Sequence, residues 1–207
     1  MHKRAFESYS LKEKYGDEQV FVVRSDLFSS LEPGLTLEKE DSIAAITMRY
    51  DKEGKFIMRY DAENNPAFLQ IIPYVIIKNK AGQYFAYERL EDSTEDRLRH
   101  QISIGFGGHI NPCDGPTLFM FRGMMRELEE ELELTYSDPL QYIGKVKDFS
   151  AGLSDHIGFV FELEVEDADI KEKEKHRGFW MTKQDLKDKY FTLETWSRHI
   201  ADYLCER

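Results

Sequence analysis

Cysteine, proline and tryptophan are scarce in this chain of 207 residues, which contains 2, 6 and 2 of them respectively. The two cysteines, Cys113 and Cys205, are far apart in the sequence, so they provide neither a disulfide framework nor the spacing of a cysteine metal site. Free thiols are stable in a reducing compartment, and we therefore expect a cytoplasmic protein.

Long apolar runs are also missing. No stretch approaches the roughly 18 residues that a membrane-spanning helix needs. Residues 1–4 lead into a polar stretch instead of the apolar segment of a signal peptide. We therefore expect no membrane association.

Basic residues are too few to balance the acidic ones. Lys and Arg number 28 against 39 Asp and Glu, so the formal net charge is −11. This charge argues against binding to nucleic acids, which requires a basic face. It does not exclude a small phosphorylated substrate, because a bound metal ion can reverse the local charge. The 14 Phe and 11 Tyr residues indicate a folded chain with a sizeable core.

The hydrophobic pattern indicates a mixture of strands and helices. Pro73 places its predicted strand at an edge, or marks a bulge or the start of the strand, and Thr36 is a plausible cap for the first predicted helix. The mixture favours an α/β or α+β sandwich. We predict strands at 19–24, 70–78, 83–88, 101–106, 140–149, 156–165 and 179–181, helices at 36–48 and 116–134 and from 182 and 192, and charged loops at 91–99 and 166–175.

Within the helix predicted at 116–134, three glutamates lie within one turn. Glu127, Glu130 and Glu131 share one side because residues three and four apart face the same way. Like charges at this spacing repel, whereas a hard cation such as Mg²⁺ or Mn²⁺ would attract all three. The alternative is an ordinary acidic helix face in an acidic protein.

The same helix has an apolar stripe. Phe121, Met125, Leu128 and Leu132 recur at spacings of four, three and four, which predicts the face that packs on the core. Arg126 lies four residues before Glu130 and can pair with it. This pair would either orient Glu130 for a metal ion or be a plain surface ion pair of little energetic value.

Upstream, the predicted strand at 101–106 ends in Gly107 and Gly108, where the backbone can approach a ligand closely. Together with Arg-Glu-Leu-x-Glu-Glu at 126–131, this loop resembles the signature of the Nudix hydrolases. Gly108 matches the first signature glycine, and Asp114 stands where the family has a glutamate. Two features depart from the pattern: eleven residues rather than seven separate Asp114 from Arg126, and Glu133 replaces a glycine.

The resemblance implies a Nudix-like α/β/α sandwich with a mixed β-sheet and a signature loop and helix. It covers residues 67–207, which would form the hydrolase domain. Residues 1–66 would be an N-terminal extension that acts as a flap, a dimer arm or added strands. Homodimers are common in the family, so a homodimer is one expectation for this chain.

The resemblance also implies hydrolysis of a phosphoanhydride bond in a nucleoside diphosphate derivative or a related small molecule, with Mg²⁺ or Mn²⁺ as cofactor. The metal ligands would be Glu127, Glu130, Glu131 and a backbone carbonyl of Gly108 or its neighbour Gly107. Arg126 would orient the glutamates, and one of them could deprotonate the attacking water.

Further candidates carry weaker patterns. Glu172 and Glu174 precede a late tryptophan, in the loop from which many family members draw the base or another ligand, but both alternate with lysines as exposed glutamates do. Glu174 is our candidate of the two. His109 could meet a phosphate or be a structural loop residue. Arg89 and Arg97 could contact the substrate or be solvated surface arginines.

Two other functions stay open. A Nudix-like module that binds nucleotides without catalysis usually lacks signature carboxylates, and all three are present here. An isopentenyl diphosphate isomerase shares the fold but needs a catalytic cysteine and several histidine ligands, for which Cys113 offers only a faint parallel.

Overall fold

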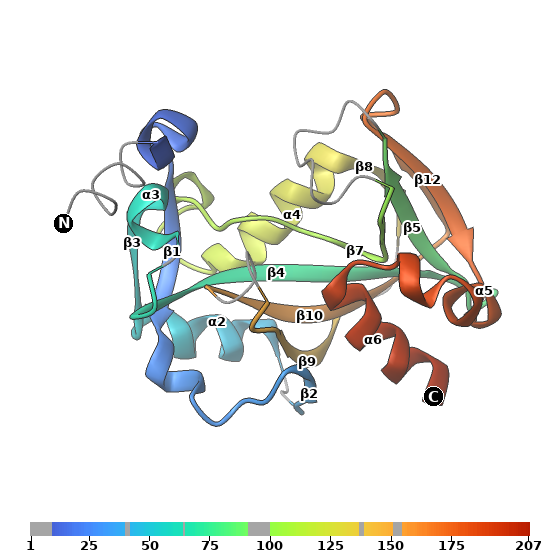
Figure 1. Ribbon diagram of the computed structural model, residues 1–207, viewed down its shortest axis with the longest axis horizontal. Coiled ribbons are helices and arrows are strands. Elements are labelled where there is room, and N and C mark those ends of the chain that lie inside the picture. The colour runs from blue at the N-terminus through green and yellow to red at the C-terminus, as the bar shows by residue number, and fades with distance from the viewer. Residues whose placement is uncertain (1–9, 40–41, 64, 91–99, 137–138, 151–154) are drawn as a thin grey trace.

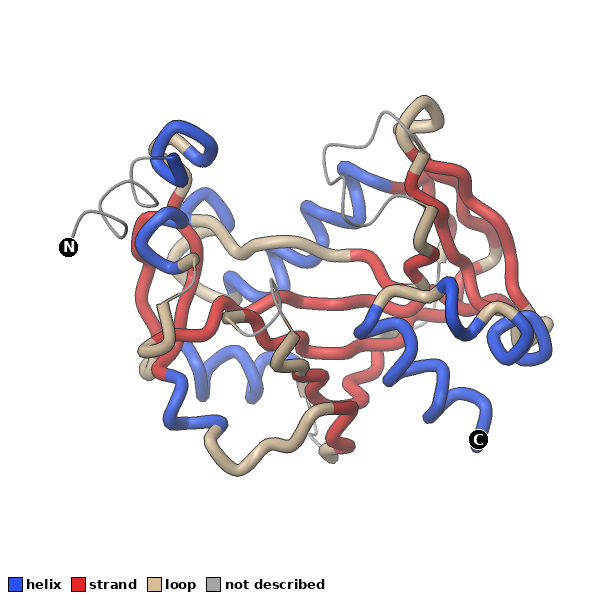
Figure 2. Tube along the Cα trace, viewed as in Figure 1, coloured by secondary structure: helices blue, strands red, loops and turns tan. Residues whose placement is uncertain are grey.

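The computed structural model describes residues 10–39, 42–63, 65–90, 100–136, 139–150 and 155–207. A mixed β-sheet forms the centre of the molecule, and its longest path has the order β12-β5-β4-β10-β9-β2 (Figure 1, Figure 2). Its strands are β1 (Gln19–Arg24), β2 (Gly34–Leu37), β3 (Gly54–Met58), β4 (Phe68–Asn79), β5 (Tyr84–Arg89), β6 (Ile102–Ser103), β7 (Gly105–Phe106), β9 (Gln141–Lys147), β10 (His156–Val165) and β12 (His176–Met181).

The central strands β4 and β10 are parallel, and their register runs without a break from Gln70 opposite His156 to Asn79 opposite Val165. On its other edge β4 pairs first with β1, at residues 68–70, and then with β7, at residues 75–76. Pro73 lies in the gap between these two pairings. The strand at 70–78 is therefore confirmed, but Pro73 marks neither an edge strand nor a strand start.

Strands from the first 66 residues belong to this same sheet. β1 pairs with β3 and β4, and β2 extends the far edge by pairing with β9. Figure 1 shows β1 and β3 upright at one end of the sheet, with the short helix α3 (Arg59–Ala62) beside them. The backbone of the N-terminal extension thus supplies added strands.

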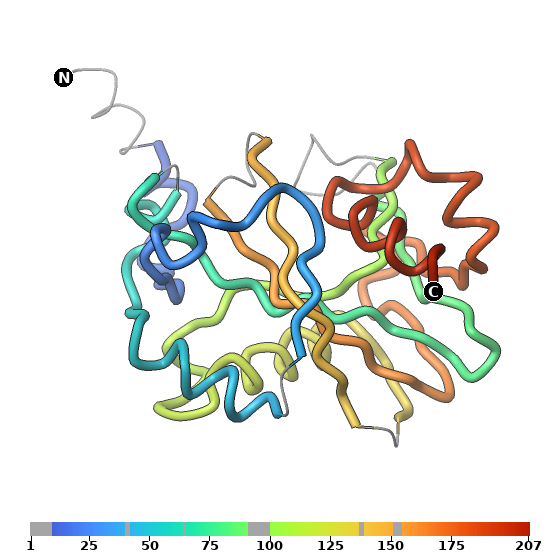
Figure 3. The backbone as a smooth tube through the Cα atoms, turned by 90° about the horizontal axis from the view of Figure 1, so that it is seen from below, coloured from blue at the N-terminus to red at the C-terminus, as the bar shows by residue number. Residues whose placement is uncertain are grey.

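Helices cover both faces of the sheet because β4 alternates its side chains between them. Leu69, Ile71 and Val75 join the core under α4 (Phe119–Glu131) and α2 (Ile43–Asp51). Ile72 and Ile76 join the core under α5 (Lys183–Asp188) and α6 (Thr195–Glu206). Figure 3 shows α2 and α4 on one side of the sheet and α6 on the other. The α/β/α sandwich with a mixed sheet is confirmed.

A buried polar network ties α6 to the sheet. The Ser197 hydroxyl lies 3.0 Å from the hydroxyl of Tyr74 on β4, and it accepts a hydrogen bond of 3.0 Å from the backbone N–H of Ile104. The Tyr74 hydroxyl also lies 3.0 Å from the hydroxyl of Ser103. The network therefore fixes the β6–β7 junction to strand β4 and to helix α6. This junction leads into the Gly107–Gly108 loop.

The helix predicted at 36–48 is confirmed from residue 43, but its start and its Thr36 cap are wrong. Residues 34–37 form β2, and α2 begins later with Ser42 as its cap, whose side chain accepts from the Ala45 N–H at 3.1 Å. Thr36 and Leu37 instead pair with Lys145 and Gly144 of β9, since tertiary contacts override weak propensities.

The loop predicted at 166–175 is also partly wrong. Residues Asp167–Ile170 form β11, which pairs with β8 (Leu132–Thr135) in a separate two-stranded sheet. Ala168 and Ile170 are buried while Asp167 and Asp169 are exposed, an alternation hidden within the charged run. The remaining predicted strands and the helix after Thr182 are confirmed, whereas the predicted loop at 91–99 lies outside the described residues. In the ranges given above, no helix is both long and apolar enough to cross a membrane.

Replacing Ser197 with alanine should lower the free energy of unfolding by about 1–3 kcal/mol, because the buried Ile104 N–H and Tyr74 hydroxyl lose a partner. Chemical denaturation followed by circular dichroism measures this change. Ser30→Ala, at an exposed serine, is the control and should be close to neutral. Equal stabilities of the two variants would contradict the role of the network.

Candidate functional site

Helix α4 carries the predicted carboxylates on the side away from the core. Met120, Met124 and Leu128 are buried at spacings of four and pack on the sheet. The predicted core stripe is therefore wrong in part, since Phe121 is 37 % exposed and Met125 is only partly buried. The helix is also shorter than predicted, because the β-strand β8 follows it directly at Leu132.

Arg126 is the centre of the polar contacts around α4. Its Nη1 donates to Glu127 Oε1 at 2.8 Å and to Glu130 Oε2 at 3.2 Å. Its Nη2 donates to the backbone oxygen of His109 at 2.9 Å and to Asn111 Oδ1 at 3.0 Å. One guanidinium therefore joins two of the three glutamates to the loop that follows β7.

Asp114 completes this arrangement from a short 3₁₀ helix, Pro112–Asp114. The side chain is buried; its Oδ1 accepts from Arg126 Nε at 2.8 Å, and its Oδ2 accepts from the Asn111 N–H at 2.8 Å. An aspartate at this position, where the signature has a glutamate, thus still reaches the arginine. The longer loop between Asp114 and Arg126 does not separate them.

Gly108 lies directly against Glu127. A Cβ atom added at Gly108 would lie 2.4 Å from the carboxyl carbon of Glu127, so only glycine leaves room for this carboxylate. At Gly107 an added Cβ would lie 1.9 Å from the backbone oxygen of Pro73. Gly108 is therefore required because the loop closely approaches Glu127, and Gly107 is required because the loop closely approaches strand β4.

Glu131 faces a small pocket at the end of α4. Its neighbours there are Tyr87, Phe106, Ile170, Glu172 and His176. Burial and then the charge of Glu127 raise the pKa of Glu131 to about 8, with smaller contributions from Glu172 and Glu130, while Arg89 opposes the shift. Burial also raises the pKa of Glu127, although Arg126 opposes the shift. The carboxyl groups at this end of α4 therefore bring together more negative charge than Arg89 and Arg126 neutralise.

The backbone of Glu131 is held from the small sheet. Its carbonyl oxygen accepts from the Lys171 N–H at 2.9 Å, just after β11 ends. Leu132 pairs with Ile170 at the start of β8. The position of this carboxylate thus depends on β11 as well as on α4.

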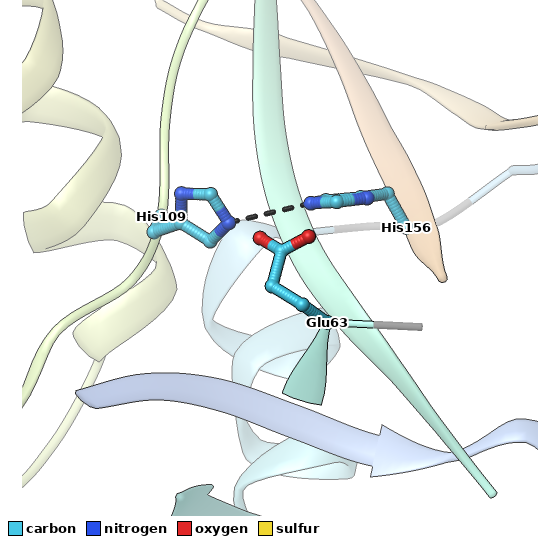
Figure 4. Close-up of side chains that lie close together, drawn as sticks. All are labelled: Glu63, His109 and His156. Carbon is cyan, nitrogen blue, oxygen red and sulfur yellow. Dashed lines mark hydrogen bonds between the residues drawn. The ribbon is translucent and has the colours of Figure 1, made fainter. Parts of the chain in front are cut away.

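His109 lies in a second group of side chains. Its Nε2 is 3.4 Å from Nε2 of His156 at the start of β10, and Glu63, which follows α3, lies beside both (Figure 4). In the part of the chain that the structure describes, ligand atoms of these three residues lie within 4.8 Å of one another, a convergence that the α4 glutamates do not reach. Burial lowers the pKa of His109 well below its usual range.

A larger pocket of about 340 Å³ lies elsewhere, between the 3₁₀ helix Ser25–Phe28 and strands β4 and β9. It is lined by Phe28, Leu69, Lys147 and Asp155, among others, and by none of the α4 glutamates. Although this pocket is larger than the one beside Glu131, it does not contain the signature residues.

No family model matches the chain. Protein YmaB of Bacillus subtilis (strain 168) is 37 % identical over 204 residues, which cover 91 % of this chain and 98 % of YmaB. The chain belongs to the YmaB family. The solved structure described as "Tm1382, a putative Nudix hydrolase" superposes with a TM-score of 0.78 at 23 % identity, covering 91 % of this chain and 99 % of Tm1382. The chain has the Nudix fold, so the resemblance in its sequence is confirmed at that level.

The residues of this YmaB-family site fit a hard divalent cation. Glu127 and Glu131 are carboxylates whose pKa values are raised first by burial. The charge of Glu130 adds to the shift at Glu127, and the charge of Glu127 adds to the shift at Glu131, so a cation would relieve the repulsion. The backbone of Gly108 lies directly against the Glu127 carboxylate, which brings the loop to the same point. Oxygen-only donors of this kind suit Mg²⁺ or Mn²⁺.

The other predicted residues have varied places. Arg89 lies near Glu131, and its Nε donates to Glu194 Oε1 at 2.9 Å and its Nη2 to the Tyr87 hydroxyl at 3.0 Å. Glu174 is exposed, and Glu172 is the acidic residue of that loop that borders the Glu131 pocket. Arg97 lies outside the described residues.

Several site residues were missed from the sequence. Asn111 and His176 give no pattern, since a single asparagine or histidine is common in loops and strands. Glu63 and His156 are 93 positions apart in the chain and meet only through the fold. Glu172 and Glu174 both alternate with lysines, and only their positions in the turn after β11 distinguish them.

The raised pKa of Glu131 predicts that the metal-free protein loses stability as the pH rises. The unfolded state releases this proton near 4.5 and the folded state near 8, so stability is full below 4.5 and falls across that window. Each pKa unit is worth about 1.4 kcal/mol, so the loss should be on the order of 5 kcal/mol, or about 10–20 °C in Tm. Thermal melts in EDTA from pH 5 to 9 measure it.

Glu131→Gln is the control for that experiment, since an amide cannot ionise. The variant should melt with a shallower dependence on pH and should exceed the wild-type Tm at pH 8.5. Parallel pH profiles for the two proteins would show that Glu131 is not the group responsible.

Proposed function

We propose that the protein hydrolyses a phosphoanhydride bond in a small phosphorylated molecule, with a nucleoside diphosphate derivative as the substrate class. The observation that carries the proposal is the half-buried Glu131 beside Glu127, on a helix whose Arg126 is tied to the loop containing Gly108. Carboxylates that are gathered and withdrawn from water in this way are unfavourable unless the site uses them. The proposal extends the Nudix fold of the chain to Nudix chemistry.

A bound Mg²⁺ or Mn²⁺ would supply neutralisation of the phosphoryl oxygens and a water of lowered pKa. Glu127, Glu130 and Glu131 would hold the cation together with the backbone oxygen of Gly108. Arg126 orients Glu127 and Glu130 through hydrogen bonds of 2.8 and 3.2 Å. A guanidinium fixed at Asp114 cannot follow these carboxylates into solvent, so it limits their motion.

Two carboxylates are placed to accept a proton from water. Glu131 has a pKa of about 8, near the working range of a general base. Glu172 borders the same pocket from the loop after β11. We favour these two residues over Glu174, which does not border this pocket.

The walls of the pocket suit the part of the substrate that does not react. Tyr87, Phe106 and His176 offer ring surfaces, and the Tyr87 and His176 rings lie edge to face with centroids 5.0 Å apart. Arg89 brings positive charge close to Glu131 and can attract a phosphate. Aromatic walls beside a cation and a guanidinium fit a molecule with a planar group and a diphosphate.

Glu131→Gln should reduce turnover by about 10²–10⁴-fold, because the amide neither ligates as strongly nor accepts a proton. Phosphate release from nucleoside di- and triphosphates, sugar nucleotides and dinucleoside polyphosphates, with Mg²⁺ and with Mn²⁺, measures the effect. Glu129→Gln is the matched control on the exposed side of α4 and should retain activity.

Two outcomes would reject the proposal. The first is turnover that survives Glu127→Gln and Glu131→Gln together. The second is tight binding of a panel member by the wild-type protein with no phosphate release under either cation, which would favour a binding module without catalysis.

Gly108→Ala should reduce turnover more than it reduces stability, because the added methyl group displaces the Glu127 carboxylate and not the core. Kinetics of Gly108→Ala, Glu127→Gln and the double variant form a thermodynamic cycle. If Gly108 acts by leaving space for Glu127, the double variant should be no slower than Glu127→Gln. Additive losses would contradict this.

The cytoplasmic location, the homodimer and the division of the chain at residue 66 stay predictions. The choice between Mg²⁺ and Mn²⁺ is part of the assay described above.

A further inference from the structure

Three potential ligands meet at a point that the signature does not include. Glu63 comes from the end of α3, His109 from the loop after Gly108, and His156 from the start of β10. Figure 4 shows the two imidazole rings pointing at each other and the Glu63 carboxylate directed into the gap between them. The three side chains come from separate segments of the fold, so no local sequence requirement brings them together.

The distance between the two histidines fits a shared ion better than a hydrogen bond. Their Nε2 atoms are 3.4 Å apart, which is longer than the usual 2.7–3.2 Å or so for a hydrogen bond. Two Zn–N bonds of about 2.05 Å at a tetrahedral angle place the nitrogens about 3.3–3.4 Å apart. The rings therefore already have the separation that a tetrahedral ion imposes.

Asp155 orients one of these rings. His156 Nδ1 lies 2.9 Å from Asp155 Oδ1, and Asp155 is only 5 % exposed. A carboxylate in this position accepts the Nδ1 proton, so the lone pair of His156 is on Nε2 and faces His109. A carboxylate that fixes a histidine from behind is the usual outer partner of a histidine metal ligand.

Gln70 gives an independent indication of a ligand. It lies opposite His156 in the parallel register of β4 and β10, so both side chains leave the same face of the sheet. On its other side Gln70 pairs with Val22 of β1, which packs with Ala62 of α3, the residue before Glu63. Gln70 is fully buried, and neither its amide nitrogen nor its amide oxygen has a hydrogen-bond partner among the described residues.

A buried amide without partners costs roughly 1–3 kcal/mol, which folded proteins seldom leave uncompensated. Its backbone lies between that of His156 on β10 and the strand β1 that packs on α3, so the amide belongs to strands that border the cluster. A bound ion with its water would supply a partner of the kind this amide lacks. Arg59 donates to Glu63 Oε1 at 3.2 Å and holds that carboxylate in place.

We propose that Glu63, His109 and His156 bind a divalent transition-metal ion, with zinc as the best match, at a site separate from the α4 glutamates. Two imidazoles and a carboxylate select zinc or a similar ion, whereas the oxygen-only donors of α4 suit Mg²⁺ or Mn²⁺. The ion would bind the loop after Gly108 to α3 and β10. Because the His109 carbonyl accepts from Arg126, the ion would also fix one anchor of that guanidinium.

The test is zinc binding to the full-length protein after removal of metals, by calorimetry and by elemental analysis of dialysed samples. The wild type should bind one zinc ion that Glu63→Gln and His156→Gln weaken by at least about 10-fold each, since each removes a ligand. Asp155→Asn should weaken it by about 10–100-fold. Circular dichroism confirms that each variant is folded.

His199→Gln is the matched control. His199 is also a partly buried histidine paired with an aspartate, at 2.9 Å from Asp148 Oδ2, but it is not part of the cluster. This variant and Glu131→Gln should bind zinc as the wild type does. The visible spectrum of the Co²⁺ form gives a second readout, which should change in His156→Gln and not in His199→Gln.

Unchanged zinc stoichiometry and affinity in both Glu63→Gln and His156→Gln would overturn the proposal. Zinc binding lost in Glu131→Gln but kept in His156→Gln would also overturn it, because the ion would then belong to α4. If His156→Gln does not fold, Glu63→Gln decides, since that change preserves the size of the side chain.

Discussion

The guanidinium of Arg126 joins the loop after β7 to helix α4, and the arrangement of the candidate site depends on this one group. Its donors reach a buried carboxylate, two glutamates of its own helix and a backbone oxygen of the loop. A planar donor with fixed geometry can satisfy several acceptors at once, which a lysine cannot. The loop and the helix thus move as one body, and Glu127 stays against Gly108.

The sheet supplies the rigid support for that body. β4 is buried on both faces and contacts α4 through one set of side chains and α6 through the other. Gly107 touches the backbone of β4 at Pro73, so the loop begins from a fixed point. The first strands of the chain add to this support, since β1 pairs with the start of β4, close to where β10 presents His156.

Much of this architecture is predictable from the sequence because it follows from local patterns. The apolar runs of β4 and β10 and the spacing of Arg126, Glu127, Glu130 and Glu131 each lie within one segment. The segment at 36–48 was misjudged at its start because Thr36 and Leu37 pair with β9, a contact that no local pattern reveals. The apolar stripe of α4 was predicted in part: Leu128 and Leu132 are buried, whereas Met120 and Met124 face the core in place of Phe121 and Met125.

The group at Glu63, His109 and His156 was beyond prediction for a related reason. Its members are 46 and 47 positions apart in the chain, and each alone is an ordinary polar residue. Only the register between β4 and β10 and the position of α3 bring them together. Even the preference for Glu172 over Glu174 depends on where the turn after β11 points.

The direct passage from α4 into β8 has a consequence for the wall of the pocket beside Glu131. The helix ends at Glu131 and the strand begins at the next residue, so the two-stranded sheet of β8 and β11 extends directly from the site. Ile170 and Glu172, which border the pocket, belong to β11 and the turn after it. This small sheet is separate from the central one, but Leu132, Ala168 and Ile170 belong to the hydrophobic core. A change of sequence there would alter the wall of the pocket and the packing beneath α4 together.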